Sequence, residues 1–434
     1  MRYFVQSWFS TPSSPIGVDF GSDCLRLAQV EPVDGEYRLV AAASAGVPPH
    51  VRNEPISRFN FFVDNVRELL AQGNFRGRRV ALNMPASMMH IQHLRLPKMD
   101  EEGLKKALPW EIRGKVPFDP TQAVLRHIIA GEIFHDQEPK FEVIVMAARK
   151  DLVEQLIASA AKARLDVAGI NVEPKAVLDC FSRIYRRKAD FDTATLFADI
   201  GCTATRAIIT QGGRIRFARA VPIGGEHFSR AVASAMQIPL EQARVMRAKL
   251  AEEEEVVAQE SPQPAPAGVP AVPRDDNSFA LLSAAVAAAE KSHAPVSPAG
   301  EVRPTAAPAA AAQPENASQL VPTEERQRVE LSCHEPVTRL VEELSLCRRY
   351  YETTFPNQPV QRMVFIGGEA NQRGLCQQIA RSLGIAAQIG DPMTRINKDS
   401  DVGIEAGIDR RRPQPAWAIA IGLSMGPMAE VPAN

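Results

Sequence analysis

The 434-residue chain has no excess of charge of either sign, because 50 Lys and Arg stand against 51 Asp and Glu, for a formal net charge of -1. Such a chain has no basic footprint for a nucleic-acid backbone, so we expect no nucleic acid among its partners. It also lacks any run approaching ~20 apolar residues that could cross a bilayer. The N-terminus lacks the apolar core and cleavage site of a signal peptide. These absences predict a soluble protein.

Metal and disulfide signals are equally scarce. The six cysteines form no Cys-x-x-Cys pair, and such scattered cysteines are typical of reduced thiols in a cytoplasm. His90 and His93 stand close together, but no further ligand follows at a metal-binding interval. A solvated strand edge is therefore favoured over a metal site at this pair.

Proline, by contrast, is plentiful, and it is unevenly spread. Residues 252–328 hold 11 of the 34 prolines and 19 alanines, with Phe279 as the only aromatic residue. A segment of this composition buries too little apolar surface to offset its ordering entropy. We therefore expect a disordered insert over 252–328.

The rest of the chain alternates strand-like and helical patterns, which predicts an α/β architecture. The strand-like runs are Ile16 to Val18, Leu25 to Val30, Val80 to Met84, Val143 to Ala147, Thr195 to Ile200, Ala204 to Thr210, Phe217 to Val221 and Arg362 to Ile366. The helical runs are Phe59 to Gln72, Lys150 to Ala163, Gly225 to Met236, Glu335 to Thr353 and Arg373 to Leu383.

Two segments of the chain repeat each other at an offset of 180 residues. Residues 16–26 and 196–206 each consist of an apolar strand ending in Asp, a turn with Gly, and a second strand with Arg. Gly at the turn permits a positive φ and lets backbone N–H groups approach phosphate oxygens. Asp19 and Asp199 suit hydrated Mg²⁺, which uses one or two carboxylates. Two facing hairpins of this kind predict a nucleotide clamped between two lobes.

Two further glycine pairs offer close backbone approach. Gly367 and Gly368 follow the strand ending at Ile366 and precede a helix, which would let a base or ribose reach the backbone. Gly224 and Gly225 form a similar turn after the strand 217–221. The common phosphate loop, Gly-x-x-x-x-Gly-Lys-Ser/Thr, and the Gly-x-Ser-x-Gly elbow do not occur.

With these elements in order, the chain resembles the actin-like nucleotide-binding superfamily of actin, sugar kinases, heat-shock chaperone ATPases and FtsA. Asp19-Phe-Gly21-Ser22 is similar to its first phosphate motif, Asp199-Ile-Gly201 to its second, and Ile366-Gly367-Gly368 to its adenosine motif. Within it, four stretches resemble the PilM family of type IV pilus assembly. They are Leu94 to Asp119, Val221 to Ser229, Leu346 to Tyr351 and Ala418 to Leu423.

The resemblance implies a two-lobed actin-like ATPase fold, each lobe a mixed sheet with flanking helices, with an inserted subdomain of the PilM and FtsA type. The implied division is 1–96 and 151–192 for the first lobe, 97–150 for the inserted subdomain, 193–233 and 359–412 for the second-lobe core, 234–358 for its outer subdomain with the insert, and 413–434 for a closing helix and tail.

The resemblance also implies site residues and cofactors, namely ATP and Mg²⁺. Asp19 would orient Mg²⁺ through water, and Asp199 would orient the metal or the attacking water. The cofactor-binding residues would be Gly21, Ser22, Gly201, Thr203, Gly224, Gly225, Gln242, Gly367 and Gly368. Members of the family usually carry Glu-Ala-Glu and then Lys where this chain has Gln242, Ala243, Arg244 and Arg247, and Gln242 can still accept a ribose hydroxyl. Hydrolysis would be slow or absent, since losing a few supporting groups leaves binding without turnover.

The implied role is that of a cytoplasmic component of the inner-membrane pilus platform. It would hold the short cytoplasmic tail of a PilN-like bitopic membrane protein, between the first lobe and the inserted subdomain, and would meet the membrane only through that partner. Other platform proteins and a homo-oligomer are further possible partners. Three alternatives stay open: a small-molecule kinase of the superfamily, a nucleotide-free scaffold, and a division role like that of FtsA. No separate catalytic carboxylate for a kinase is evident. Residues 426–434 offer no amphipathic helix of the kind with which FtsA ends.

Overall fold

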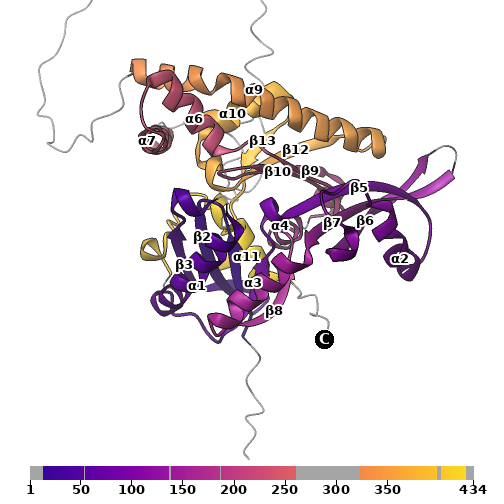
Figure 1. The fold of residues 1–434 in the computed structure, drawn as a ribbon. Helices are drawn as coiled ribbons and strands as arrows, with labels where there is room; N and C mark the ends of the chain where they lie inside the picture. Colours follow the sequence, from indigo (N-terminus) through magenta and orange to yellow (C-terminus); the bar gives the residue numbers. More distant parts are fainter. Residues whose placement is uncertain are drawn as a thin grey trace, which may run out of the picture.

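The computed structural model describes residues 13–52, 54–135, 138–185, 187–260, 323–397 and 402–426. They form two lobes, each built on a mixed sheet with flanking helices, and a smaller three-stranded subdomain (Figure 1). The α/β fold predicted from the alternating pattern is confirmed. Among the described helices, none combines the length and the apolar character needed to cross a membrane.

The first lobe is built on a six-stranded sheet of order β14-β3-β2-β1-β4-β8. The strands are β1 (Ile16–Phe20), β2 (Cys24–Val33), β3 (Glu36–Gly46), β4 (Arg79–Asn83), β8 (Asp166–Asn171) and β14 (Ile396–Asn397). All five residues of β1 are buried, as expected for a central strand whose two faces are both covered.

Helices cover this sheet. Here α1 (Pro55–Gln72) packs against α3 (Lys150–Lys162), while α4 (Glu173–Phe181) packs against α11 (Ala418–Met425). Helix α1 begins four residues before the apolar run seen in the sequence. Glu54 caps it by accepting a hydrogen bond from the Ser57 backbone N–H at 2.6 Å, and the ring of Pro55 fixes the φ of the first helical residue at a helical value.

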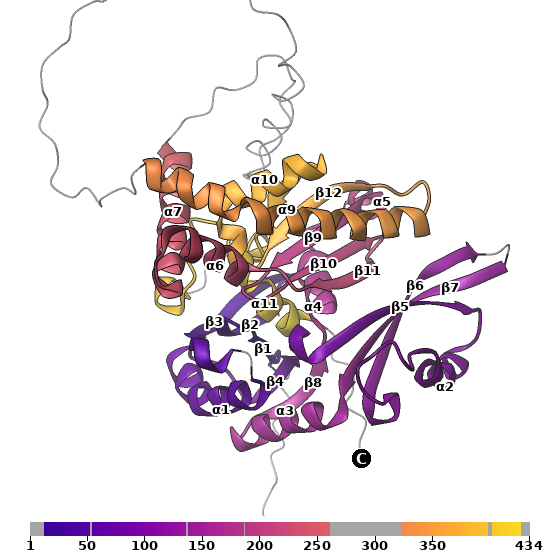
Figure 2. The same ribbon diagram turned by 45° about the horizontal axis from the view of Figure 1, so that its top comes forward.

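The C-terminal helix α11 returns from the second lobe to the first, where it packs on β1, β2 and α4 (Figure 2). The approach is close enough to require glycine on both sides. A Cβ on Gly17 would lie 2.0 Å from the Ala420 carbonyl oxygen, and one on Gly422 would lie 1.9 Å from that of Ala176. The chain thus ends its described part on the first lobe, with α11 packed tightly between β1 and α4.

The second lobe has a five-stranded sheet of order β11-β10-β9-β12-β13. Its strands are β9 (Ala194–Ile200), β10 (Thr205–Gln211), β11 (Arg214–Val221), β12 (Val360–Ile366) and β13 (Ala387–Ile389), and its helices are α5 (Lys188–Asp192), α6 (Gly225–Met236), α7 (Leu240–Glu260), α9 (Thr323–Thr354) and α10 (Arg373–Leu383). The antiparallel order β11-β10-β9 followed by parallel β12 mirrors β3-β2-β1 followed by β4. The sequence repeat is therefore a repeat of topology.

The third sheet, of order β5-β7-β6, carries the inserted subdomain. Its elements are β5 (Met89–Pro97), α2 (Glu101–Glu111), β6 (Ala123–His135) and β7 (Glu138–Arg149). Apolar side chains of α2, such as Leu104 and Leu108, pack with Leu94, Val143 and Val145 in a separate small core. The sheet begins before residue 97, because β5 already forms part of it.

The helices α7 and α9 correct the expected bounds of the insert. Residues 252–260 belong to α7 and residues 323–328 to α9, whereas we expected both stretches to be disordered. The helices extend into these stretches from buried anchors beside them, since Leu250 of α7 and Val329 of α9 pack in one small core with Val232 and Ala243. The remainder of the expected insert, 261–322, lies outside the described residues.

Candidate nucleotide site

Two hairpins with the same charge pattern face each other across the cleft. In β1–β2, Asp19 is the cross-strand partner of Arg26, and in β9–β10, Asp199 is the partner of Arg206. The Asp and Arg positions shared by the two sequence repeats are therefore direct neighbours in each hairpin. At the tips, the Thr203 hydroxyl donates a hydrogen bond to the Ser22 hydroxyl at 3.2 Å. The structure thus brings the two predicted phosphate turns into contact.

A cavity of about 240 Å³ lies at these hairpins. Seven of the predicted site residues line it: Asp19, Gly21, Ser22, Asp199, Gly201, Gly367 and Gly368. A neighbouring cavity of about 590 Å³ shares part of this lining and continues past Gly225 to α7. Together the two cavities join the predicted phosphate turns to the predicted adenosine motif.

Asp19 and Asp199 are buried carboxylates in the smaller cavity, 6 % and 3 % exposed. Burial raises the pKa of Asp19 to about 7, against the opposing attraction of Arg26 and Arg206. The pKa of Asp199 is also raised, first by burial. The Asp19 carboxylate accepts a hydrogen bond from the Asn83 side-chain amide at 3.3 Å. Each carboxylate thus lies where its negative charge is incompletely compensated.

Arg206 makes its hydrogen bonds to Glu173, and not to Asp199. Its guanidinium donates two hydrogen bonds to Glu173, of 2.7 and 2.8 Å, and its Nη1 lies 3.3 Å from Asp199 Oδ2. That oxygen of Asp199 is buried and accepts no hydrogen bond. A buried carboxylate oxygen that accepts no hydrogen bond, beside a second buried carboxylate, fits a hydrated Mg²⁺ ion, which would restore the charged forms of both.

The described residues contain no group of three or more His, Cys, Asp and Glu side chains placed to hold a metal directly. A Mg²⁺ ion in this cavity would therefore depend on the two aspartates, water and phosphate oxygens, as Mg²⁺ at nucleotide sites commonly does.

The adenosine motif also offers open backbone. Gly367 has φ +88°, and a Cβ there would lie 2.5 Å from Asp199 Oδ1, so only glycine fits beside the carboxylate. A Cβ added at Gly368 would have no neighbour within 4 Å, so this residue faces open space. A flat base or ribose can approach the backbone at this point.

Gly224 and Gly225 hold the second hairpin in place. The backbone N–H of Gly225 donates to the Gly201 carbonyl at 3.0 Å, and that of Glu226 to the Cys202 carbonyl at 2.8 Å. A Cβ on Gly224 would lie 2.4 Å from the same Gly201 oxygen. Gly225 lines the larger cavity, but Gly224 is not among the lining residues, so packing accounts for its glycine.

Helix α7 presents different residues from the one predicted. Gln242 is exposed and is not among the residues that line either cavity, whereas Arg244 and Arg247 line the larger one. Arg247 is 5 % exposed, and it pairs with Glu369 at 2.5 Å and donates to the Gly225 carbonyl at 3.1 Å. This pairing fixes α7 against the adenosine motif.

Several site residues were missed by the sequence reasoning: Asn83, Glu173, Arg52 and Glu369. The sequence repeat already marked Arg26 and Arg206, since both copies carry Arg at the same place. Glu173 and Asn83 have no such signal, because they reach the site through the packing of β4 and α4.

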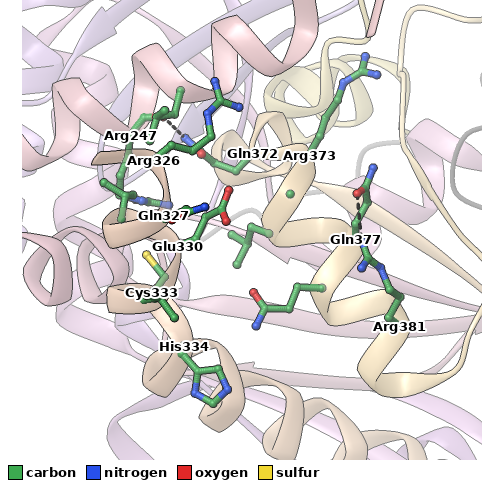
Figure 3. A pocket seen from close by; sticks show the side chains of 16 residues that line it. Arg247, Arg326, Gln327, Glu330, Cys333, His334, Gln372, Arg373, Gln377 and Arg381 are labelled. Atoms are coloured by element: carbon green, nitrogen blue, oxygen red, sulfur yellow. Dashed lines mark hydrogen bonds between the residues drawn. The ribbon is translucent and has the colours of Figure 1, made fainter. Parts of the chain in front are cut away.

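A separate cavity of about 810 Å³ lies between α9 and α10. Figure 3 shows Arg326, Glu330 and His334 on the α9 wall and Arg373 and Arg381 on the α10 wall. No predicted site residue lines it. Arg247 and Gln372 line both this cavity and the 590 Å³ one, so they form the wall between them.

The inserted subdomain contacts the second lobe through a buried polar cluster. Glu142, which is fully buried, accepts a hydrogen bond from the Tyr350 hydroxyl at 2.7 Å and contacts His93 Nδ1 at 2.9 Å. His93 Nε2 lies 3.1 Å from the Ala218 carbonyl oxygen, and its ring stacks on Phe217. The interpretation of His93 as part of a solvated strand edge is therefore wrong, because the second lobe covers that face of β5.

The chain is similar to known proteins in sequence and in fold. The family model described as type IV pilus assembly protein PilM matches residues 17–256, more than half of the chain, and that of cell division protein FtsA matches residues 196–422. A solved structure titled PilM-PilN type IV pilus biogenesis complex is 18% identical, with a TM-score of 0.65 over 95% of this chain and 98% of that chain. The ethanolamine utilization protein EutJ from Carboxydothermus hydrogenoformans is 13% identical, with a TM-score of 0.45 over 96% and 90%.

The two lobes, the repeated hairpins and the cleft between them define an actin-like ATPase fold. The chain belongs to the family of the type IV pilus assembly protein PilM.

Proposed function

We propose that this protein binds ATP with Mg²⁺ between its lobes and holds the cytoplasmic tail of a PilN-like membrane protein, as a cytoplasmic component of the inner-membrane platform that assembles type IV pili. The observation that carries the nucleotide part is the meeting of the two Asp–Gly hairpins at Ser22 and Thr203. It joins two phosphate-type turns and two buried carboxylates in one cavity.

The chain's own residues have distinct parts in this proposal. The hydroxyls of Ser22 and Thr203 donate to phosphate oxygens that enter between them, and the open backbone at Gly368 seats the nucleoside. Asp19 and Asp199 hold Mg²⁺ through water, and that ion supplies charge neutralisation on the phosphates. Since both carboxylates serve the metal, no further base is committed to activating water, and we expect hydrolysis to be slow or absent.

A melting experiment tests this part. A ligand at a hundred times its Kd adds about 2.7 kcal/mol of stability, so saturating ATP with Mg²⁺ should raise the melting temperature. An unchanged melting temperature at millimolar ATP would contradict nucleotide binding and favour the scaffold alternative.

The tail-binding part is supported by the junction between the first lobe and the inserted subdomain. Ile91 of β5, Ile128 of β6 and Val153 of α3 are half-buried apolar side chains packed against the first-lobe core. An apolar junction of this kind can hold alternate side chains of an extended peptide. The related solved structure is titled as a complex of PilM with PilN. The protein would thereby associate peripherally with the inner membrane through its partner.

The tail part is tested with a fluorescent peptide from the N-terminus of a PilN-like protein. Ile128→Glu and Val153→Glu should each weaken binding at least about tenfold, because burying a charge in an apolar contact is costly. Ile129→Glu is the matched control, since Ile129 is 37 % exposed and faces the opposite side of β6. Equal peptide affinity in all three variants would place the tail elsewhere.

A further inference from the structure

We propose that the cleft carries a second phosphate subsite, formed by Arg52 of the first lobe and Arg244 of the second. It would select a nucleotide that bears an additional phosphate on its ribose. The inference rests on the proposed nucleotide binding and adds the class of nucleotide.

The two arginines reach one carboxylate from opposite lobes. Arg52 Nη2 lies 2.6 Å from Asp23 Oδ1, and Arg244 Nη1 lies 4.0 Å from the same oxygen. The side chains of Arg52 and Arg244 are 8 % and 16 % exposed, whereas that of Asp23 is 58 % exposed. All three line the 590 Å³ cavity.

Arg52 has a buried donor group without a partner, and Arg244 has one that forms ion pairs but no hydrogen bond. The Nη1 atoms of Arg52 and Arg244 are buried and make no hydrogen bond. Arg52 donates from Nε to the Val47 carbonyl at 3.1 Å. Arg244 Nη1 forms an ion pair with Glu241 at 3.2 Å as well as with Asp23, and Arg244 Nη2 contacts Glu226 at 3.4 Å. A buried donor left without a hydrogen bond is unfavourable, and an acceptor entering from the cavity would offer a hydrogen bond to both Nη1 groups at once.

The position of Arg244 points to the ribose. Its Nη2 contacts Cys202 Sγ at 4.0 Å, next to the tip of the second hairpin. Arg247, one helical turn further along α7, is bonded to Glu369 of the adenosine motif. A nucleotide with its phosphates at the hairpins and its base at that motif must therefore pass its ribose alongside Arg244.

Asp23 stands where the added phosphate would bind. A phosphate monoester carries more charge than a carboxylate and more acceptor oxygens, and the guanidinium fork suits it. Because Asp23 is mostly exposed, its side chain can turn toward water when the phosphate enters. The phosphate would then join the two lobes through Arg52 and Arg244.

Calorimetric titration of the full chain with AMP and with adenosine 3′,5′-bisphosphate, at fixed ionic strength, tests the proposal. Titration with the 2′,5′ isomer shows which ribose hydroxyl must carry the added phosphate. One of the bisphosphates should bind at least about tenfold tighter than AMP, a difference ordinary for a charge-assisted pair. Arg52→Gln and Arg244→Gln should each bring that affinity ratio close to one. Asp23→Asn should increase the ratio, because it removes the competing carboxylate.

Arg230→Gln is the matched control. Arg230 also pairs with Glu226 but is exposed and is not among the residues lining the cavity, so the ratio should stay unchanged. Equal affinity for AMP and both bisphosphates would overturn the proposal and leave nucleotide binding intact. The proposal would also be overturned if adding inorganic phosphate to AMP raised the affinity as much as the ribose phosphate does. If neither ATP nor any of these nucleotides binds, the proposed function falls and this inference falls with it.

Discussion

The hydroxyl of Thr203 donates to that of Ser22 across 3.2 Å, joining turns that lie 181 residues apart in the chain. Each hydroxyl belongs to one copy of the internal repeat, so equivalent ends of the two lobes meet. Hydroxyl groups can both donate and accept, and the pair can therefore exchange its mutual hydrogen bond for bonds to phosphate oxygens.

Thr203→Ala should weaken ATP binding about two- to tenfold, since one hydrogen bond contributes roughly 0.5–1.5 kcal/mol. Titration calorimetry with Mg²⁺ present measures the change. Thr338→Ala is the control, because its hydroxyl is exposed and donates to the His334 carbonyl on α9. If both variants bind ATP like the unchanged protein, the hairpin tips do not contact the phosphates.

Glu173→Gln should destabilise the fold by about 3–5 kcal/mol, because it leaves the charge of the buried Arg206 without its bidentate partner. Urea unfolding measures the loss. Arg149→Gln removes an exposed pair with Asp151, and it should cost less than about 1 kcal/mol. Similar losses for the two variants would show that the Glu173 pair is not an organising contact of the cleft.

Two adjacent tyrosines of α9 give a sharp test of the contact between the inserted subdomain and the second lobe. Tyr350→Phe removes the hydrogen bond to buried Glu142 and should cost about 1–3 kcal/mol. Tyr351→Phe should be neutral or slightly stabilising, since the Tyr351 hydroxyl is buried without a partner. Thermal unfolding of the two variants compares them, and the reverse order of stability would contradict this assignment.

Asp391 should make the free energy of unfolding depend on pH. Burial raises the pKa of its carboxyl above the ordinary 3.8, so its stabilising contribution is present below that value and is lost as pH rises through the folded-state pKa. Asn in its place keeps an oxygen that accepts from the Met393 and Gln414 N–H groups, both at 3.1 Å.

Asp391→Asn should therefore melt at a higher temperature than the unchanged protein near neutral pH, and the difference should disappear below pH 3.8. Melting curves across this range measure it. A constant difference at every pH would show that the substitution acts through packing instead of charge.

The repeat made the hairpins predictable because it is a local pattern: an apolar strand, Asp, Gly and Arg within eleven residues. The same locality explains why the C-terminal end of α1 and both ends of α6 were predicted correctly. Glu173 and Asn83 could not be found in this way, since they reach the hairpins only through tertiary packing.

Gln242 illustrates a different limit. The family pattern predicted that α7 faces the nucleoside, and α7 does line the 590 Å³ cavity, but which of its residues line that cavity depends on the rotation of the helix. The ion pair of Arg247 with Glu369 sets that rotation, and it leaves Gln242 exposed. Residues 252–260 and 323–328 were misjudged because their composition resembles a linker while Leu250 and Val329 anchor the adjoining helices.

Titration of ATP into the unchanged protein and into Asp19→Ala, with and without Mg²⁺, tests the central claim most directly. The account predicts saturable binding that weakens at least about tenfold when either Mg²⁺ or the Asp19 carboxylate is removed, as expected for a charge-assisted metal contact. Asp151→Ala, which alters an exposed aspartate, should bind as the unchanged protein does. The account would be contradicted if the unchanged protein did not bind ATP, or if its affinity for ATP stayed the same without Mg²⁺ and in Asp19→Ala.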